Sequence, residues 1–327
     1  LLTIIFFFVR ESAIDQAPPN LNNNPLQAEI RLGISRSPLS APLVVAVEQQ
    51  FFEQEGLKPT LIIYDSGKAA LDGLFNNEVD LAVAAPTPLV FASFKRSDFR
   101  ILAAIVSTYR DSKVLVRRDT RIRDFPDLRG RRVGVHRGTS GYFFLLSLLA
   151  EYGLDASDIH EQDIRSPDLP QALARHEVDA IAVWEPHAYL ARQLLDDQVL
   201  ELETGDSFRT TFNLVIKDDF ATTHQLEIQA ILRALKTAET FMGAEAGVAQ
   251  SLVAERLDLS PALVEKLWPE YSFRLFLDQA LIIDLESQAR WLLDQGLITD
   301  RTFPDYIELL ETNPLKSLAP DAMRIIE

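Results

Sequence analysis

The sequence predicts an α/β protein of two domains, each built on a mostly parallel sheet. Short apolar segments alternate with helical stretches in two successive series, which is the pattern of βαβ units. The chain has 327 residues, which is long for a single hydrophobic core. After about residue 225 it becomes mainly helical. We expect this last part to pack back on the first domain, so that the chain passes twice between the domains.

The N-terminal 27 residues are expected to lie outside the folded part. Residues 1–9 form an apolar run that is too short to span a bilayer but has the size of a secretion-signal core. Residues 17–25 are rich in proline and asparagine and resemble a flexible tether. We therefore interpret residues 1–27 as a signal or anchor remnant with a linker, and cleavage or anchoring stays open.

The first series of elements covers residues 28–110. Strands are expected at residues 28–35, 57–64, 79–84 and 100–106, from their alternating or continuous apolar pattern. Helices are expected between them, ending at 55, at 77 and near 95.

The second series covers residues 111–210, with a return to the first domain over 211–327. Strands are expected at 113–117, 132–135, 159–164, 178–184 and 199–203, with helices at 140–152, 168–176 and 186–195. The strands at 113–117 and 210–217 are expected to mark the two crossings. Helices at 225–244, 247–257, 260–268 and 278–295, with a strand near 271–276, complete the prediction.

Two segments of the chain echo each other. Residues 77–86 and 176–186 share the order Glu-Val-Asp, an apolar strand and then a proline at an expected helix start. Over so few residues the echo could be chance. If it is real, both domains present the same kind of strand end to a shared cleft, where open α/β sheets bind ligands.

The stretch 131–144 combines a short strand, a glycine-containing turn and a helix whose first-turn amides Thr139 or Ser140 can cap. Free amides and the positive end of the helix dipole make such a start a natural seat for an anion. An ordinary capped turn between strand and helix is the alternative.

Composition excludes several classes of function. The net charge of -16 disfavours nucleic acid as a partner, although a local basic pocket is still allowed. The absence of cysteine excludes disulfides and thiolate sites, and the five histidines show no metal-binding spacing. Serine-hydrolase, phosphate-loop and dinucleotide motifs are missing, so we predict a non-enzymatic protein without cofactor or metal.

Several short motifs, in this order, resemble the solute-binding proteins of nitrate, sulfonate and taurine ABC importers, a group that includes binders of thiamine-pyrimidine precursors. The motifs are Pro42-x5-Glu48-x2-Phe51-Phe52-x2-Glu55-Gly56-Leu57, Leu74-x3-Glu78-Val79-Asp80, Ile122-x5-Leu128-Arg129-Gly130-x2-Val133-Gly134-Val135-x2-Gly138-Thr139, Val178-Asp179-Ala180-x3-Trp184-Glu185-Pro186 and Pro320-x-Ala322-x2-Ile325-Ile326. The resemblance implies a type II periplasmic binding protein, with two α/β lobes joined by two crossing strands. It further implies a periplasmic monomer that closes on a small molecule and docks on a membrane permease.

Two departures from this family pattern stand out. The family usually has glycine before the phenylalanine pair, where this chain has Gln50, which we predict to sit on a helix without effect on the fold. The enzymatic pyrimidine-synthase branch uses a cysteine-rich motif, and the lack of cysteine here argues against that branch.

The resemblance implies that the cleft residues lie in the turns after the strands and at the first crossing. They are Arg36, Ser37, Ser40, Gly67, Lys68, Pro86 and Thr87 in the first lobe, Tyr109, Arg110 and Asp111 at the crossing, and Arg137, Thr139, Ser140, Tyr142, Trp184, Glu185 and His187 in the second lobe.

Individual roles follow from the chemistry of these side chains, each with a structural alternative. The hydroxyls of Ser40 and Thr87 can bind an acidic head group or only cap a helix. Arg110 can neutralise an anion or pair with Asp111. Trp184 can stack on a ligand or pack within its lobe.

Glu185 is expected to bind an amine on the ligand, or else to favour a helix start. The predicted function is capture of a small sulfonate or taurine-like compound for an ABC importer. Alternatives are nitrate or bicarbonate, a heteroaromatic vitamin precursor such as an aminopyrimidine or riboflavin, or an anchored sensory domain.

Overall fold

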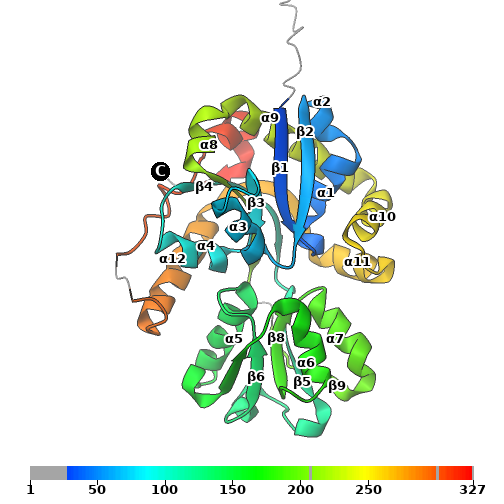
Figure 1. The fold of residues 1–327 in the computed structure, drawn as a ribbon, viewed down its shortest axis with the longest axis vertical. Coiled ribbons are helices and arrows are strands. Elements are labelled where there is room, and N and C mark those ends of the chain that lie inside the picture. The colour runs from blue at the N-terminus through cyan, green and yellow to red at the C-terminus, as the bar shows by residue number, and fades with distance from the viewer. Residues whose placement is uncertain (1–27, 206–207, 300–301, 326–327) are drawn as a thin grey trace, which may run out of the picture.

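A computed structural model describes residues 28–205, 208–299 and 302–325 (Figure 1). These residues form two α/β lobes stacked along the long axis of the molecule, each with its own sheet. The signal or anchor expected over residues 1–27 and the end of the last family motif, Ile326, lie outside the described ranges. Within those ranges no helix is both long and apolar enough to cross a membrane.

The first lobe is built on a seven-stranded sheet in the order β12-β11-β4-β10-β3-β1-β2 among the described residues. Its strands are β1 (Ala28–Ser35), β2 (Leu57–Tyr64), β3 (Leu81–Ala84), β4 (Phe99–Thr108), β10 (Thr210–Lys217), β11 (Ser272–Asp278) and β12 (Met323–Arg324). β1 lies between β2 and β3 and pairs with both in parallel, whereas β10 runs antiparallel to β3 and β4. The carboxyl ends of β1, β2 and β3 therefore share one edge of the sheet.

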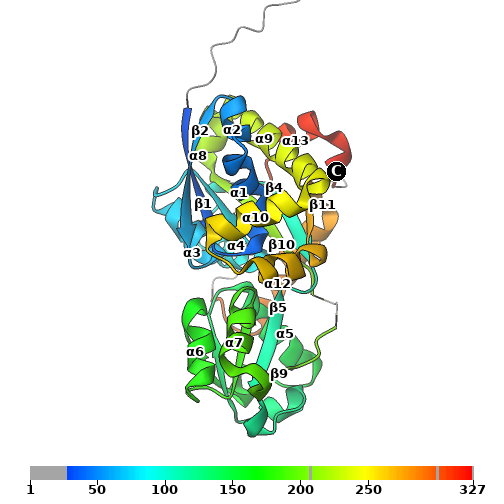
Figure 2. The same cartoon turned by 90° about the vertical axis from the view of Figure 1, so that its right-hand side faces the viewer.

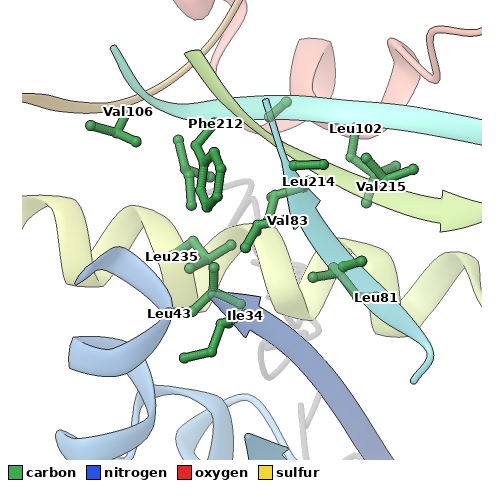
Figure 3. Packing of buried hydrophobic residues seen from close by; sticks show 14 of the residues in the cluster. Ile34, Leu43, Leu81, Val83, Leu102, Val106, Phe212, Leu214, Val215 and Leu235 are labelled. Atoms are coloured by element: carbon green, nitrogen blue, oxygen red, sulfur yellow. The ribbon is translucent and has the colours of Figure 1, made fainter. Parts of the chain in front are cut away.

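Helices from both ends of the chain cover this sheet. They are α1 (Ala41–Glu48), α2 (Phe51–Gln54), α3 (Gly67–Phe75), α4 (Pro86–Ser93), α8 (Asp218–Thr223), α9 (Gln225–Ala244), α10 (Ala246–Leu257), α11 (Pro261–Leu267), α12 (Gln279–Asp294) and α13 (Asn313–Leu318). Leu235 of α9 packs in the same apolar cluster as Leu43 of α1 and Val83 of β3 (Figure 3). The C-terminal helices thus complete the core of the first lobe.

The second lobe holds a five-stranded sheet in the order β7-β6-β8-β5-β9 within the described ranges. Its elements are β5 (Ser112–Arg117), β6 (Arg132–Val135), α5 (Ser140–Glu151), β7 (His160–Asp163), α6 (Leu169–Ala174), β8 (Ala180–Trp184), α7 (His187–Leu195) and β9 (Val199–Glu201). Ala180 and Ala182 pack in one apolar cluster, and Ile181 and Val183 pack in another. This alternation along β8 shows that both faces of the sheet are buried.

The chain passes between the lobes twice, between β4 and β5 and between β9 and β10 (Figures 1 and 2). The first passage needs only residues 109–111. Thr210, where β10 begins, pairs with Thr108, the last residue of β4, so both passages meet the first sheet at the same place.

The echo between residues 77–86 and 176–186 has a structural counterpart in each lobe. Asp80 binds the backbone amide and guanidinium of Arg31 on β1, and Asp179 binds the same groups of Arg132 on β6. The two segments differ in where the proline lies relative to the following helix. Pro86 is the first residue of α4, but Pro186 precedes α7, which starts at His187.

The helix expected to run to residue 55 is divided into α1 and α2, and the prediction that Gln50 sits on a helix is wrong. Gln50 separates the two helices with φ of 58°, in the left-handed region. Glycine adopts this region without the steric penalty of a Cβ atom. The local backbone thus accounts for the glycine that the family usually has at this position.

Candidate ligand-binding cleft

A pocket between the two lobes holds about 360 Å³ of empty space, open solvent included. The residues that line it are Ser35, Ser37, Leu39, Ser66, Gly67, Lys68, Ala85, Pro88, Asp111, Thr139, Ser140, Trp184, Thr210 and Phe212. Most of them follow the carboxyl ends of strands, which is where open α/β sheets bind ligands. Both lobes and the first crossing contribute to this cleft.

The start of α3 forms part of the first-lobe wall. Ser66 caps this helix, its hydroxyl accepting a 3.1 Å hydrogen bond from the amide of Ala69. The amides at the start of a helix have no partner within the helix, and the helix dipole makes this end positive. The ammonium group of Lys68 adds a charge, although it also pairs with Asp72 at 2.8 Å.

Gly67 permits a close approach between α3 and β10. A Cβ atom on this residue would lie 3.0 Å from the ring of Phe212 and 3.2 Å from the Cα atom of Ala84. The lack of a side chain therefore lets the start of α3 reach the cleft beside Phe212.

The start of α5 forms the opposite wall. The expected capping by Thr139 does not occur, because its hydroxyl donates a 2.6 Å hydrogen bond to the carbonyl of His136. Thr139 and Ser140 nevertheless both line the cleft. Two helix starts, one from each lobe, thus meet the same cavity, and such an arrangement favours an anion.

Trp184, at the end of β8, supplies the large aromatic surface of the cleft. Gly141 on α5 leaves room for it, since a Cβ atom there would lie 3.2 Å from the indole. The ring of His187 packs edge-on against Trp184 with 5.7 Å between ring centroids. Burial lowers the pKa of His187 to about 4, so this imidazole is neutral at pH 7.

Asp111 lies at the first crossing and lines the cleft. Its Oδ1 accepts a 3.1 Å hydrogen bond from the hydroxyl of Tyr271. Burial, and secondly the negative charge of Glu185, raise the pKa of Asp111 to about 8. Among the ion pairs of the described residues, none joins Arg110 to Asp111.

Seven of the predicted site residues line the cleft, namely Ser37, Gly67, Lys68, Asp111, Thr139, Ser140 and Trp184. The other ten do not: Arg36, Ser40, Pro86, Thr87, Tyr109, Arg110, Arg137, Tyr142, Glu185 and His187.

Several of these ten have other partners in the fold. The guanidinium of Arg36 donates to the carbonyl of Leu257 at 2.8 Å, and the hydroxyl of Ser40 donates to the carbonyl of Ser35 at 2.9 Å. Arg137 forms an ion pair with Glu161 within the second lobe.

Glu185 also faces away from the cleft. One carboxylate oxygen pairs with Arg192 at 2.8 Å, and the other accepts from the amide of Tyr189 at 2.8 Å. Its charge is therefore compensated within the second lobe, and the expected contact with a ligand amine has no support in this geometry.

The lining residues that the sequence did not indicate are Ser35, Leu39, Ser66, Ala85, Pro88, Thr210 and Phe212. Ser66 carried a readable signal, because serine before a glycine at a helix start is a common cap. Thr210 and Phe212 carried none, because they reach the cleft only through the pairing of β10 with β3 and β4. In the described ranges, no group of three or more His, Cys, Asp or Glu side chains is arranged to hold a metal ion.

The family model described as NMT1/THI5 like matches residues 37–246 of the chain. The chain belongs to this family. A relative from Bacillus subtilis (strain 168), named a putative aliphatic sulfonates-binding protein, is 27% identical over 244 residues, 73% of each chain. The structure of the alkanesulfonate-binding protein SsuA from Xanthomonas axonopodis pv. citri bound to MOPS is similar with a TM-score of 0.77 and 25% identity, covering 87% of this chain and 98% of that one.

This NMT1/THI5-like protein has the predicted fold of the periplasmic binding proteins, with two α/β lobes joined by two crossings. An enzyme is also among the relatives of this chain. The 4-amino-5-hydroxymethyl-2-methylpyrimidine phosphate synthase of Aspergillus parasiticus is 22% identical over 240 residues, 69% of each chain. The sulfonate-binding relatives show the higher identity.

Proposed function

We propose that this protein is the substrate-binding component of an ABC importer and captures a small sulfonate in the cleft between its lobes. The observation that carries the proposal is the meeting of two helix starts, α3 and α5, at one pocket between the lobes. Each start belongs to a different lobe, so an anion bound to both stabilises the closed arrangement. The sulfonate-binding relatives support this choice of anion.

A sulfonate suits the groups that line the cavity. Its three oxygens share one negative charge and accept several hydrogen bonds, which helix amides and the hydroxyls of Ser37, Ser140 and Thr210 can donate. The organic part of the ligand is then left to Leu39, Trp184 and Phe212. The protein needs no catalytic group for this task, so we propose binding without turnover.

The proposed importer role also implies a location, an oligomeric state and a partner for the protein. We propose that it works in the periplasm as a monomer and delivers its ligand to a membrane permease, with lobe closure as the signal. Nucleic acid is not a partner in this scheme.

Thermal unfolding with a panel of ligands tests the proposal. The panel holds ethanesulfonate, taurine, nitrate, bicarbonate, an aminopyrimidine and riboflavin. Sulfonates are expected to stabilise the protein by about 2.7 kcal/mol at a hundred times their dissociation constant. The variant Arg137→Ala, altered outside the cleft, should show the same shifts. A shift with the aminopyrimidine and none with sulfonates would overturn the sulfonate proposal.

A further inference from the structure

Asp111 is a buried carboxyl group in the wall of the cleft, with 2% of its surface exposed. Its Oδ1 accepts one hydrogen bond, 3.1 Å long, from the hydroxyl of Tyr271. In the described part of the chain, no further hydrogen bond and no ion pair reaches this carboxyl group. A carboxylate can accept about four hydrogen bonds, so Asp111 has unused capacity in a place with little water.

The charged groups nearby do not supply the missing partner. Glu185 and Glu270 are negative and act against ionisation of Asp111. The ammonium of Lys113 acts in its favour but pairs with Glu201 at 3.4 Å. A buried carboxylate without a cation is costly, so Asp111 either holds a proton or requires a positive group from outside the protein.

The walls at the starts of α3 and α5 differ from Asp111 in the charge that they attract. There the amides, the hydroxyls and Lys68 favour a negative group, as described above. The cleft therefore offers one binding position for an anion and, at Asp111, a second binding position for a hydrogen-bond donor or a cation. A ligand with a sulfonate at one end and a primary amine at the other satisfies both binding positions.

We infer that Asp111 receives the ammonium group of the ligand and selects a short ω-aminosulfonate over sulfonates that lack an amine. This inference rests on the proposed function, which places a sulfonate in the same cleft. Asp111 takes the role that the sequence had suggested for Glu185, because Glu185 is already paired with Arg192.

Calorimetric titration with matched ligands tests this assignment. Taurine, isethionate and ethanesulfonate share the sulfonate and differ only in an amine, a hydroxyl or a hydrogen at the other end. The protein variants are wild type, Asp111→Asn and, as a control, Asp321→Asn at an exposed position far from the cleft. Asparagine keeps an acceptor for the hydroxyl of Tyr271, and thermal unfolding verifies that the variant folds.

Wild type is expected to bind taurine best, and Asp111→Asn to weaken taurine on the order of 30-fold, since it removes one charge of a buried pair. Ethanesulfonate should change by less than about threefold, and Asp321→Asn should change neither ligand. The preference for taurine over ethanesulfonate in wild type should also increase from pH 6 to pH 8, as Asp111 loses its proton.

Two results would overturn the inference while leaving the proposed function intact. One is equal affinity of wild type for taurine and ethanesulfonate. The other is an equal loss of both ligands in a folded Asp111→Asn. A further pair of ligands, β-alanine and propionate, tests the role of Asp111 independently of the sulfonate proposal. If no sulfonate binds but β-alanine exceeds propionate and loses this advantage in Asp111→Asn, the sulfonate proposal fails and the role of Asp111 stands.

Discussion

Asp65 of the first lobe and Arg165 of the second lobe form an ion pair that joins the lobes beside the cleft. Asp65 directly precedes Ser66, which lines the cavity. The side chains are 50% and 67% exposed, so water screens their attraction. A second contact between the lobes is apolar: the rings of Phe143 on α5 and Trp291 on α12 meet edge to face, with 5.1 Å between centroids. Charge and aromatic packing thus both hold the two lobes in contact.

Loss of the Asp65–Arg165 pair should loosen closure only slightly. We expect Arg165→Ala to weaken ligand affinity by no more than about fivefold, because an exposed pair contributes about 0–1 kcal/mol. The effect should shrink further in high salt. Titration of ligand at low and high ionic strength measures it. Arg129→Ala, which breaks a pair with Asp158 inside the second lobe, should not change affinity. A tenfold or larger loss in Arg165→Ala would mean that Arg165 contacts the ligand.

Thr87 is expected to stabilise the fold without binding the ligand. Its hydroxyl is fully buried and donates a 2.8 Å hydrogen bond to Gln288, whose amide nitrogen donates to Asp284 at 2.9 Å. Thr87→Val leaves the buried oxygen of Gln288 without a donor. Chemical denaturation should show a loss of about 1–3 kcal/mol in the free energy of unfolding. Ligand affinity of the folded variant should match wild type. A loss of affinity without a loss of stability would mean that Thr87 contacts the ligand.

Gly67→Ala should damage both the fold and the cleft. Alanine normally stabilises a helix relative to glycine by about 1 kcal/mol. Here the new Cβ atom would lie 3.2 Å from the backbone of Ala84 and 3.0 Å from Phe212, so α3 or β10 must move. We expect lower stability and weaker ligand binding. Gly247→Ala on α10 is the matched control and should be neutral or stabilising, because a new Cβ atom there meets nothing within 4 Å beyond the backbone of its own helix. If both variants gain stability, α3 tolerates the methyl group.

The raised pKa of Asp111 predicts a dependence of stability on pH. Its pKa is about 8 in the folded protein against an ordinary value of 3.8, so between these values the folded state holds a proton that the unfolded state releases. The stabilisation is complete below about pH 3.8 and is lost as pH rises through about 8. Asp111→Asn removes this titration. The difference in free energy of unfolding between wild type and Asp111→Asn should therefore move against wild type from pH 5 to pH 9, and a constant difference would contradict the raised pKa.

Among the described residues, the sequence predicted every strand except β12, and about half of the cleft, for a physical reason. Parallel strands end at a common edge, so the turns after them converge, and the family resemblance placed Gly67, Thr139, Ser140 and Trp184 among the cleft residues. The direction of a side chain within such a turn depends on its neighbours. Ser40 and Glu185 turn to partners inside their own lobes, and local sequence does not specify this.

The pairing of strands far apart in the chain also could not be predicted from local sequence. Phe212 reaches the cleft because β10 runs antiparallel to β3 and β4, more than a hundred residues earlier in the chain. Asp111 was indicated as a site residue. That no ion pair reaches its carboxyl group within the described ranges emerges only from the positions of Glu185, Arg192 and Lys113.

Calorimetric titration of ethanesulfonate into wild type and Trp184→Ala tests whether the cleft between the lobes binds a sulfonate. Ethanesulfonate carries the sulfonate and almost nothing else, and Trp184 lines the cleft between the lobes. We expect saturable binding of one ligand per chain to wild type and a loss of about tenfold or more in folded Trp184→Ala, in keeping with a buried aromatic anchor. The absence of binding to wild type at millimolar ligand, or equal binding by both proteins, would contradict a sulfonate site in this cleft.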